Sequence, residues 1–362
     1  MQQREPIVLY TSEKDCCACG ACLNSCPKNA ITMAEDDCGF LYPQIDEALC
    51  VRCGRCQQVC AFQHTEVTNS PVAAFAAIAK DRELASKSAS GGVFAAVARK
   101  VAAQGGVVFG AALEKDFSVR HRSCDADSLA ALQGSKYAQS DTALTFREAQ
   151  AALKEGKTVL YSGTPCQIDG LKRFLGRDYP NLLTADIICH GVPGGRMFRE
   201  YIKSLGRAHG GEVTAFTFRD KRIGWGENGS ATVGGKTVTI WQSGASYPYY
   251  FSSASIQRES CYVCPYACSH RPADITLGDF WGIEKQHPEY LGRGGWDEAA
   301  GNGQLCHPSG RGKRDEIMAT YREGGWEALE RRFEKNIGWH KHTSRVKHML
   351  PKAVKRKLKA MK

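Results

Sequence analysis

The chain has 362 residues, of which 43% are hydrophobic and 24% are charged, so it can bury two or three globular cores, and its length excludes a small single-domain protein. It has no run of about 20 apolar residues and no signal-peptide core in its first residues, which excludes a membrane-spanning helix and predicts a cytoplasmic protein. The net charge of +10 comes from residues 335–362, where ten Lys or Arg residues stand without any Asp or Glu.

Two cysteine motifs with one spacing, C-x2-C-x2-C-x3-C, stand at residues 16–26 and 50–60. Three thiolates spaced in this way wrap one iron–sulfur cube, while the fourth cysteine points to the other cluster. Zinc sites usually have two C-x2-C pairs instead, and the odd total of 17 cysteines argues against a disulfide framework. We therefore predict two [4Fe–4S] clusters, one held by Cys16, Cys19, Cys22 and Cys60 and the other by Cys50, Cys53, Cys56 and Cys26. Cys17 and Cys38 fall outside the pattern and are interpreted as bystanders.

The segment between the motifs predicts two short strands around a turn at residues 36–39, which is the layout of a two-cluster ferredoxin domain. Gly20 and Gly54 stand inside the cysteine loops, where the backbone must turn towards sulfur. A linker at residues 69–71 ends this α+β domain, which we place at residues 1–68.

From residue 72 onward, short apolar runs alternate with helical patterns, which predicts an α/β domain with a mostly parallel sheet. The expected strands are residues 72–79, 107–113, 158–163, 182–191 and 273–282. Residues 212–218 and 230–241 predict an antiparallel addition. We divide this part of the chain into residues 72–150, residues 151–290 with a third cysteine motif, and residues 291–362, a polar glycine-rich loop with a basic helical tail.

Three motifs follow predicted strands or begin helices, where open α/β sheets bind ligands. Ser90, Gly91 and Gly92 precede a helix whose N-terminus suits a phosphate. Cys166 begins the helix after the strand at 158–163, and Cys189 ends the next strand.

Farther along, three closely spaced thiols stand at Cys261, Cys264 and Cys268. They need a fourth ligand, which either Cys166 or Cys189 can supply from across the sheet, and the set favours a third iron–sulfur cluster over a zinc site that uses His270. A thiol hydrolase built on Cys166 and His190 would leave the other motif cysteines unexplained.

The motifs SASGGVF, GSKYAQS, YSGTPCQI, ICHGVP and CYVCPYACSHRPADITLGDFWG, in this order, resemble the beta-subunit family of coenzyme F420-reducing hydrogenase and F420-linked formate dehydrogenase over residues 8–290. The resemblance implies a flavin, normally FAD, beside a [4Fe–4S] cluster in the α/β body. It also implies flavin contacts for Ser90, Gly91, Gly92 and Lys136, and a third cluster on Cys261, Cys264, Cys268 and one of Cys189 or Cys166. We favour Cys189 as this fourth ligand and place Cys166 at the flavin.

The sequence thus predicts an oxidoreductase that passes electrons between a flavin and [4Fe–4S] clusters, with a soluble donor or acceptor that could be F420. The alternative is a non-catalytic electron-transfer subunit that wires a partner redox subunit to a carrier. Residues 290–316 have no strand pattern where the family has a strand. The tail from Val346 to Met361 has the pattern of a basic amphipathic helix, which either packs on the body or contacts an anionic membrane surface or an acidic partner. Nucleic acid is not favoured, because no aromatic residues accompany the tail's charges.

Overall fold

The structure is a computed structural model that describes residues 6–66, 69–224, 226–242, 244–281, 297–299 and 311–349; the side chains of 297–299, 311 and 338–349 are not described. The chain divides into two compact units. The first combines residues 1–199 with 257–309, and the second combines 200–256 with 310–362. Each unit is therefore discontinuous in sequence.

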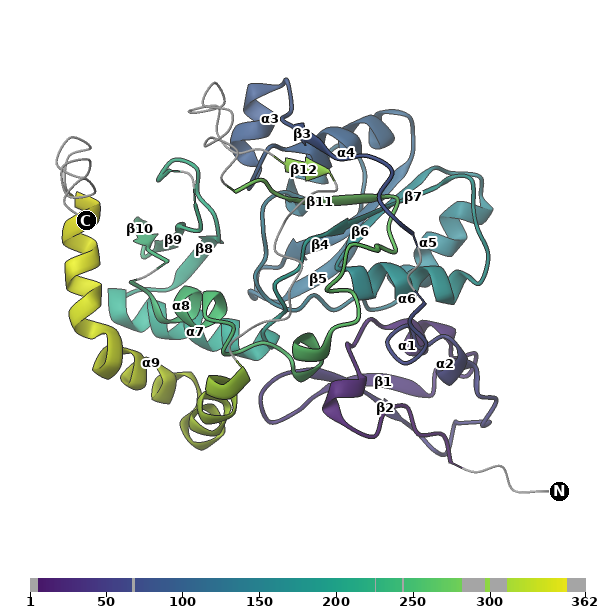
Figure 1. The fold of residues 1–362 in the computed structure, drawn as a ribbon, viewed down its shortest axis with the longest axis horizontal. Helices are drawn as coiled ribbons and strands as arrows, with labels where there is room; N and C mark the ends of the chain where they lie inside the picture. The colour runs from purple at the N-terminus through teal and green to yellow at the C-terminus, as the bar shows by residue number, and fades with distance from the viewer. Residues whose placement is uncertain are drawn as a thin grey trace. The chain divides into compact units, whose positions relative to one another are not determined.

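The N-terminal segment of the first unit is a small α+β arrangement around the two cysteine motifs (Figure 1). Strands β1 (Ile31–Glu35) and β2 (Leu41–Ile45) form the predicted antiparallel hairpin. Its turn closes because Asp36 Oδ1 accepts the backbone N–H groups of Cys38 and Phe40 at 2.9 and 2.8 Å. Short helices α1 (Ala21–Ser25) and α2 (Arg55–Gln58) follow the two cysteine loops.

The body of the first unit is a seven-stranded sheet in the order β3-β12-β11-β7-β6-β4-β5. The four central strands run parallel, and β5, β12 and β3 join the edges antiparallel. The strand bounds are β3 Phe75–Ala77, β4 Val107–Leu113, β5 Val119–Cys124, β6 Val159–Gly163, β7 Leu182–Ile187, β11 Ile275–Asp279 and β12 Asp297–Ala299. The mostly parallel central sheet predicted from the sequence is confirmed. The expectation of no strand in residues 290–316 was wrong, because β12 pairs there with both β11 and β3.

Helices cover both faces of this sheet (Figure 1). Alternate residues of one strand point to opposite faces. Phe109 and Tyr161 accordingly pack with α5 (Thr145–Lys154) and α6 (Pro165–Leu175), whereas Val108 and Leu160 pack with α4 (Val93–Ala103). Helix α3 (Arg82–Lys87) precedes α4, and its N-cap Asp81 accepts from Leu84 N at 3.0 Å. The chain passes into the second unit within α7 (Gly195–His209).

The core on the α5 and α6 face also includes part of the first cysteine loop. Cys17, Cys19 and Ala21 are buried in one cluster with Ile168 and Leu171 of α6. The cysteine loop and the α/β body therefore share one hydrophobic core instead of having one each.

The second unit contains a separate three-stranded antiparallel sheet, in the order β10-β9-β8. Its strands are β8 Val213–Thr217, β9 Gly229–Val233 and β10 Lys236–Ile240, and its helices are α8 Ser246–Ser252 and α9 Arg311–Met349. The strands predicted as an addition to the parallel sheet thus form their own sheet. In the core of this unit, the rings of Tyr201 and Tyr247 stack at 5.4 Å and Trp326 Nε1 donates to Glu330 at 3.1 Å. The pattern predicted for residues 346–361 lies in side chains outside the described part, as does Pro351.

Candidate functional site

The two cysteine loops have the same backbone conformation. Ala18 and Arg52 occupy equivalent positions with φ of 53° and 52°, and Gly20 and Gly54 follow with φ of 84° and 76°. This left-handed region is costly for Ala and Arg and free for glycine. Successive turns of this kind direct backbone N–H groups inward, and Ala18 N lies 3.4 Å from Cys16 Sγ. The repeated spacing in the sequence therefore corresponds to a repeated fold of the loop.

The structure brings together the four thiols predicted for the first cluster. Burial raises the pKa of Cys22, and nearby Cys19, Cys16 and Cys60 raise it further. Burial likewise raises the pKa of Cys60 to about 11, with contributions from Cys19 and Cys16. Four thiolates this close together and shielded from water repel one another, so they require a cationic group between them. Their chemistry fits an iron–sulfur cluster.

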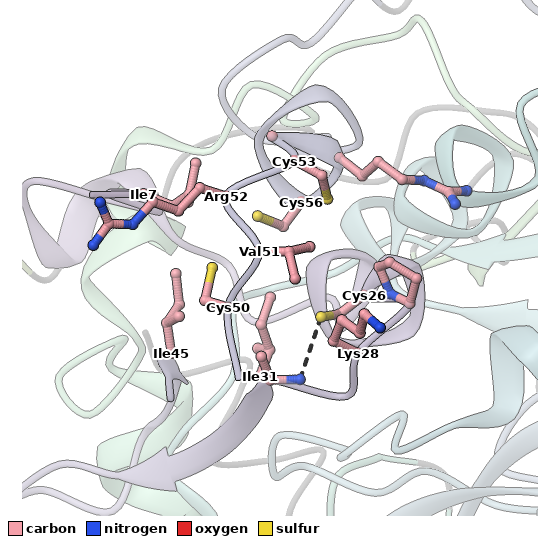
Figure 2. Close-up of a pocket in the computed structure, with 14 residues that line it drawn as sticks. Ile7, Cys26, Lys28, Ile31, Ile45, Cys50, Val51, Arg52, Cys53 and Cys56 are labelled. Carbon is pink, nitrogen blue, oxygen red and sulfur yellow. Dashed lines mark hydrogen bonds between the residues drawn. The ribbon is translucent and has the colours of Figure 1, made fainter. Parts of the chain in front are cut away.

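The four cysteines predicted for the second cluster line one hollow with an empty volume of about 350 Å³. Figure 2 shows Cys26, Cys50, Cys53 and Cys56 around this hollow, with Arg52 and Lys28 beside them. The N–H of Ala30 donates to Cys26 Sγ at 3.3 Å, the kind of hydrogen bond that holds a cluster ligand. Cys53 is exposed, whereas Cys19 in the first set is buried, so the two sites differ in their access to solvent.

A third group of thiols gathers in the body, with one member that differs from the favoured prediction. Burial raises the pKa of Cys189 to about 12, and Cys261 and Cys166 add to the rise. The pKa of Cys264 is also raised to about 12 by burial, with contributions from Cys166 and Cys189. Cys166, Cys189, Cys261 and Cys264 thus lie within electrostatic range of one another. Cys268 instead turns its Sγ to the carbonyl oxygens of Pro265 and His270, at 3.5 and 3.3 Å.

Close backbone packing builds this third group. Gly191 has a φ of 94°, and a Cβ there would lie 2.6 Å from Gln257 Cγ and 3.2 Å from Cys261 Cβ. Only glycine lets the turn after β7 approach the loop of Cys261 so closely. The N–H of Gly191 also donates to Cys189 Sγ at 3.4 Å. The Cys-His-Gly motif therefore positions Cys189 against the Cys261 loop.

Cys17, interpreted as a bystander from its spacing, lies between the first and third groups. A hydrogen bond with Cys17 lowers the pKa of Cys166, and the same contact is the main cause that raises the pKa of Cys17. Cys17 also hydrogen-bonds with Cys19. Cys166 further contacts Thr164 Oγ1 at 3.2 Å. No spacing rule pairs Cys17 with Cys166, because 148 residues separate them and the fold alone brings them together.

The glycine turn before α4 and the loop of Lys136 also come together. Gly92 caps α4 with a φ of 83°, and a Cβ there would meet Ser88 Oγ at 3.2 Å. The side-chain amide of Gln133 donates from Nε2 to Ser88 Oγ at 3.4 Å. The backbone carbonyl oxygen of Gln133 accepts from Lys136 Nζ at 2.8 Å. Burial lowers the pKa of Lys136 to about 7. Its amine donates only to the carbonyl oxygens of Ala131 and Gln133, so within the described part of the chain this buried cation has no carboxylate partner.

Two negative observations apply to the residues that the structure describes. No three Cys, His, Asp or Glu side chains converge closely enough to bind a single metal ion. A [4Fe–4S] cluster does not require such convergence, because each thiolate binds a different iron. None of the described helices has the length and apolar character needed to cross a membrane.

Comparisons with known proteins match two regions of the chain, one at the N-terminal cysteine motifs and one farther along the chain. Residues 15–64 match the 4Fe-4S dicluster domain, and residues 156–298 match the C terminus of the coenzyme F420 hydrogenase/dehydrogenase beta subunit. Among solved structures, a chain of the F420-reducing [NiFe] hydrogenase complex from Methanosarcina barkeri is 15% identical, with a TM-score of 0.43, and the match covers 74% of this chain and 93% of that one. A search of curated proteins gives no match. The chain therefore carries a 4Fe-4S dicluster domain at its N-terminal cysteine motifs and a region similar to the C terminus of the coenzyme F420 hydrogenase/dehydrogenase beta subunit, and it is an iron–sulfur electron-transfer protein related to such subunits.

Proposed function

We propose that the chain is a flavin-dependent oxidoreductase in which three [4Fe–4S] clusters carry electrons between a flavin and the surface of the first unit. The observation that supports this most is the position of the third thiol group, which contacts the first cysteine loop through Cys17 and Cys166. A flavin exchanges a hydride or an electron pair, and a cluster exchanges single electrons. Together they would link two-electron transfer at the flavin to one-electron transfer through the clusters.

The ligands that we propose for the third cluster are Cys166, Cys189, Cys261 and Cys264. Burial and the charges of neighbouring thiols raise the pKa of Cys189, Cys261 and Cys264. A bound cationic cluster would stabilise their thiolate forms. Cys166 begins α6, where the helix dipole favours a thiolate. This set replaces Cys268, which faces backbone carbonyl oxygens.

The flavin site that we propose lies at the N-terminus of α4, with Ser90, Gly91, Gly92 and Lys136. Lys136 has an amine without a carboxylate partner among the described residues, and it donates to Gln133, whose side-chain amide reaches Ser88 Oγ beside the turn that precedes α4. An anionic flavin phosphate would supply the missing negative charge. The Gly92 turn needs glycine for its own packing, because its φ is 83° and a Cβ there would lie 3.2 Å from Ser88 Oγ and 3.3 Å from Ala85 Cα.

Anaerobic purification with iron, acid-labile sulfide and flavin measured together tests this proposal. Three clusters require about twelve irons and about twelve sulfides per chain. Cys166→Ser should lose about a third of the iron, whereas Cys268→Ser, its matched control, should keep all of it. The reverse result would restore Cys268 as a ligand, and a protein with zinc and no labile sulfide would refute the proposal altogether.

The flavin is tested separately with Lys136→Met. Because a charge-assisted hydrogen bond is lost, flavin affinity should fall by about ten- to a hundredfold while iron content stays unchanged. Lys100→Met removes an exposed lysine from α4, the helix at whose N-terminus the flavin is placed, and should bind flavin normally. Equal affinity in the two variants would move the flavin elsewhere.

A second candidate function is that of a non-catalytic electron-transfer subunit, with a partner redox subunit to complete the reaction. The exposed cysteine of the second cluster site favours it, since an open cluster can exchange electrons with another protein. The two functions differ in one assay. The proposed enzyme reduces or oxidises a hydride carrier such as F420 on its own, whereas the subunit exchanges electrons only with a protein partner.

A further inference from the structure

Arg258 is a fully buried arginine at the junction between the first cysteine loop and the body. Its side chain is 0% exposed. Nε donates to the carbonyl oxygen of Cys16 at 2.7 Å, and Nη1 donates to Gln139 Oε1 at 3.1 Å. The guanidinium carbon lies 4.0 Å from the centre of the Tyr42 ring. These contacts fix the guanidinium in one position.

This buried cation has no partner for its remaining nitrogen. Nη2 is buried without a hydrogen bond, and the residues that the structure describes give Arg258 no carboxylate within 4.0 Å. Burying a charge that lacks a counter-charge is strongly unfavourable. Arg271, the other arginine buried near the thiols, differs because Asp186 pairs with it at 3.2 Å. Among the described residues, Arg258 therefore has no carboxylate counter-ion, and the side chain that can offset its charge is the Cys16 thiol, with which it hydrogen-bonds.

The thiols on which the charge of Arg258 acts belong to two different groups. Its charge acts on Cys16 of the first group and on Cys166 and Cys261 of the third. A short helix at Glu259–Val263 leads from Arg258 directly to Cys261, and the other end of the side chain binds the backbone of Cys16. The guanidinium thus lies between the two groups.

We propose that Arg258 is a positioning residue for electron transfer, whose fixed charge raises the reduction potentials of the clusters on either side of it, most of all the one held by Cys16, Cys19, Cys22 and Cys60. The inference rests on the proposed function, because it needs clusters at both thiol groups. Reduction adds one electron, and hence one negative charge, to a cluster that is already anionic. Arg258 stabilises that added charge through a medium of low dielectric constant. With both clusters bound, one electron would leave one cluster and enter the other; no bond would change, and Arg258 would release no proton, because an arginine stays protonated.

The test measures midpoint potentials by redox titration followed by electron paramagnetic resonance, on the full chain with its clusters. Arg258→Met keeps most of the side-chain volume and removes the charge, so the midpoint potential of the first cluster should shift to a more negative value. The second cluster serves as an internal reference and should not shift. Arg271→Met is the matched control: Asp186 can take up a proton when its partner is removed, so the first cluster's potential should stay close to the wild-type value.

Arg258→Lys keeps the proposal testable if the methionine variant fails to retain iron. A buried lysine keeps its charge at low pH and loses it more readily than arginine as the pH rises. The potential in this variant should therefore match wild type at low pH and become more negative as the pH increases. A low-pH potential well below wild type, with iron content complete, would overturn the role of charge. Unchanged potentials in Arg258→Met with full iron would overturn it as well, whereas a wild-type protein without labile sulfide would refute the proposed function instead.

Discussion

His121 shows how a single buried side chain is fixed in one protonation state. Its Nε2–H donates to the carbonyl oxygen of Ser162 at 2.9 Å, which leaves Nδ1 to accept from Ser140 Oγ at 2.5 Å. The ring stacks on Tyr161 at 5.5 Å between centroids. Burial lowers the pKa of His121 to about 4, so the neutral ring is the form that belongs to the fold.

This histidine makes the stability of the body depend on pH. The unfolded chain binds a proton below a pKa of about 6.5 and the folded chain only near 4, so stability is complete above pH 6.5 and falls as the pH decreases from there. Between pH 7.5 and 5.0 we expect a loss of about 2 kcal/mol from this residue. Urea unfolding of wild type and His121→Gln at both values measures it. Equal pH slopes in the two proteins would contradict the expectation.

At this scale, spacing along the chain identified the N-terminal cysteines but not their neighbours. The loop motif C-x2-C-x2-C is local, so the sequence alone placed Cys16, Cys19 and Cys22 around one site. Arg258 and Cys17 gain their roles from partners more than a hundred residues away, and no local pattern marks such contacts. The third thiol group shows both cases: the sequence named Cys166 and Cys189 as alternatives, and only the fold shows that both lie near Cys261 and Cys264.

Helix α6 is the element that joins the first cysteine loop to the body. Its start was predictable, since Thr164 and Gln167 form a capping box and Pro165 occupies the first turn. The packing of α6 could not be predicted from the sequence. Gly170 faces the first cysteine loop, and a Cβ there would lie 2.8 Å from Cys19 Sγ.

Gly170→Ala should therefore disturb the first cluster. Alanine normally stabilises a helix interior by about 1 kcal/mol relative to glycine, but here the added carbon displaces Cys19. We expect lower stability and a weaker signal from the first cluster by electron paramagnetic resonance. Gly312→Ala in α9, where nothing lies within 4 Å of the new carbon, is the control and should not destabilise the protein. A Gly170→Ala protein with its first cluster intact would show that the loop can move aside.

Arg147 of α5 secures the other side of the same loop. Its guanidinium donates to the carbonyl oxygens of Asn24 at 2.7 Å and Cys26 at 2.6 Å, and so satisfies backbone groups at the end of α1. Arg147→Met should lower the free energy of unfolding by about 1–3 kcal/mol, because these charged hydrogen bonds are buried in part. Arg99→Met removes an exposed ion pair with Asp81 and should change the free energy of unfolding much less, because solvent screens such a pair. Equal losses of unfolding free energy in the two variants, measured by denaturant unfolding, would contradict this role of Arg147.

For the whole molecule, the sequence predicted the kinds of structure along the chain but not how they group. The strands at 213–240 and the helix from residue 311 form one unit although 70 residues lie between them. Alternating apolar runs report which residues are buried, but not in which core they meet. For the same reason, the pattern that predicted the N-terminal ferredoxin domain does not show that its first cysteine loop shares a core with α6.

The two N-terminal cluster sites should differ in how fast they lose iron. The second site includes the exposed Cys53, and Val51 beside it is 51% exposed, whereas the loop of the first site is buried against the body. Mild oxidation in the presence of a chelator should remove the second cluster first. Iron release from wild type is expected in at least two phases, and Cys26→Ser should abolish the fastest. Loss of iron in one phase would show that both sites are equally accessible.

The shared core of the first cysteine loop also has a consequence for cutting the chain. Buried contacts among Cys17, Cys19 and Ile168, together with the hydrogen bonds of Arg147 and Arg258, hold the N-terminal segment whether or not the peptide bond after it is intact. Proteolysis near Asn69 should leave two fragments that stay associated and elute together. The linker at residues 69–71 is therefore a suitable point at which to divide the protein into two separately produced fragments. We expect the two fragments to associate again through the core that the first cysteine loop shares with α6.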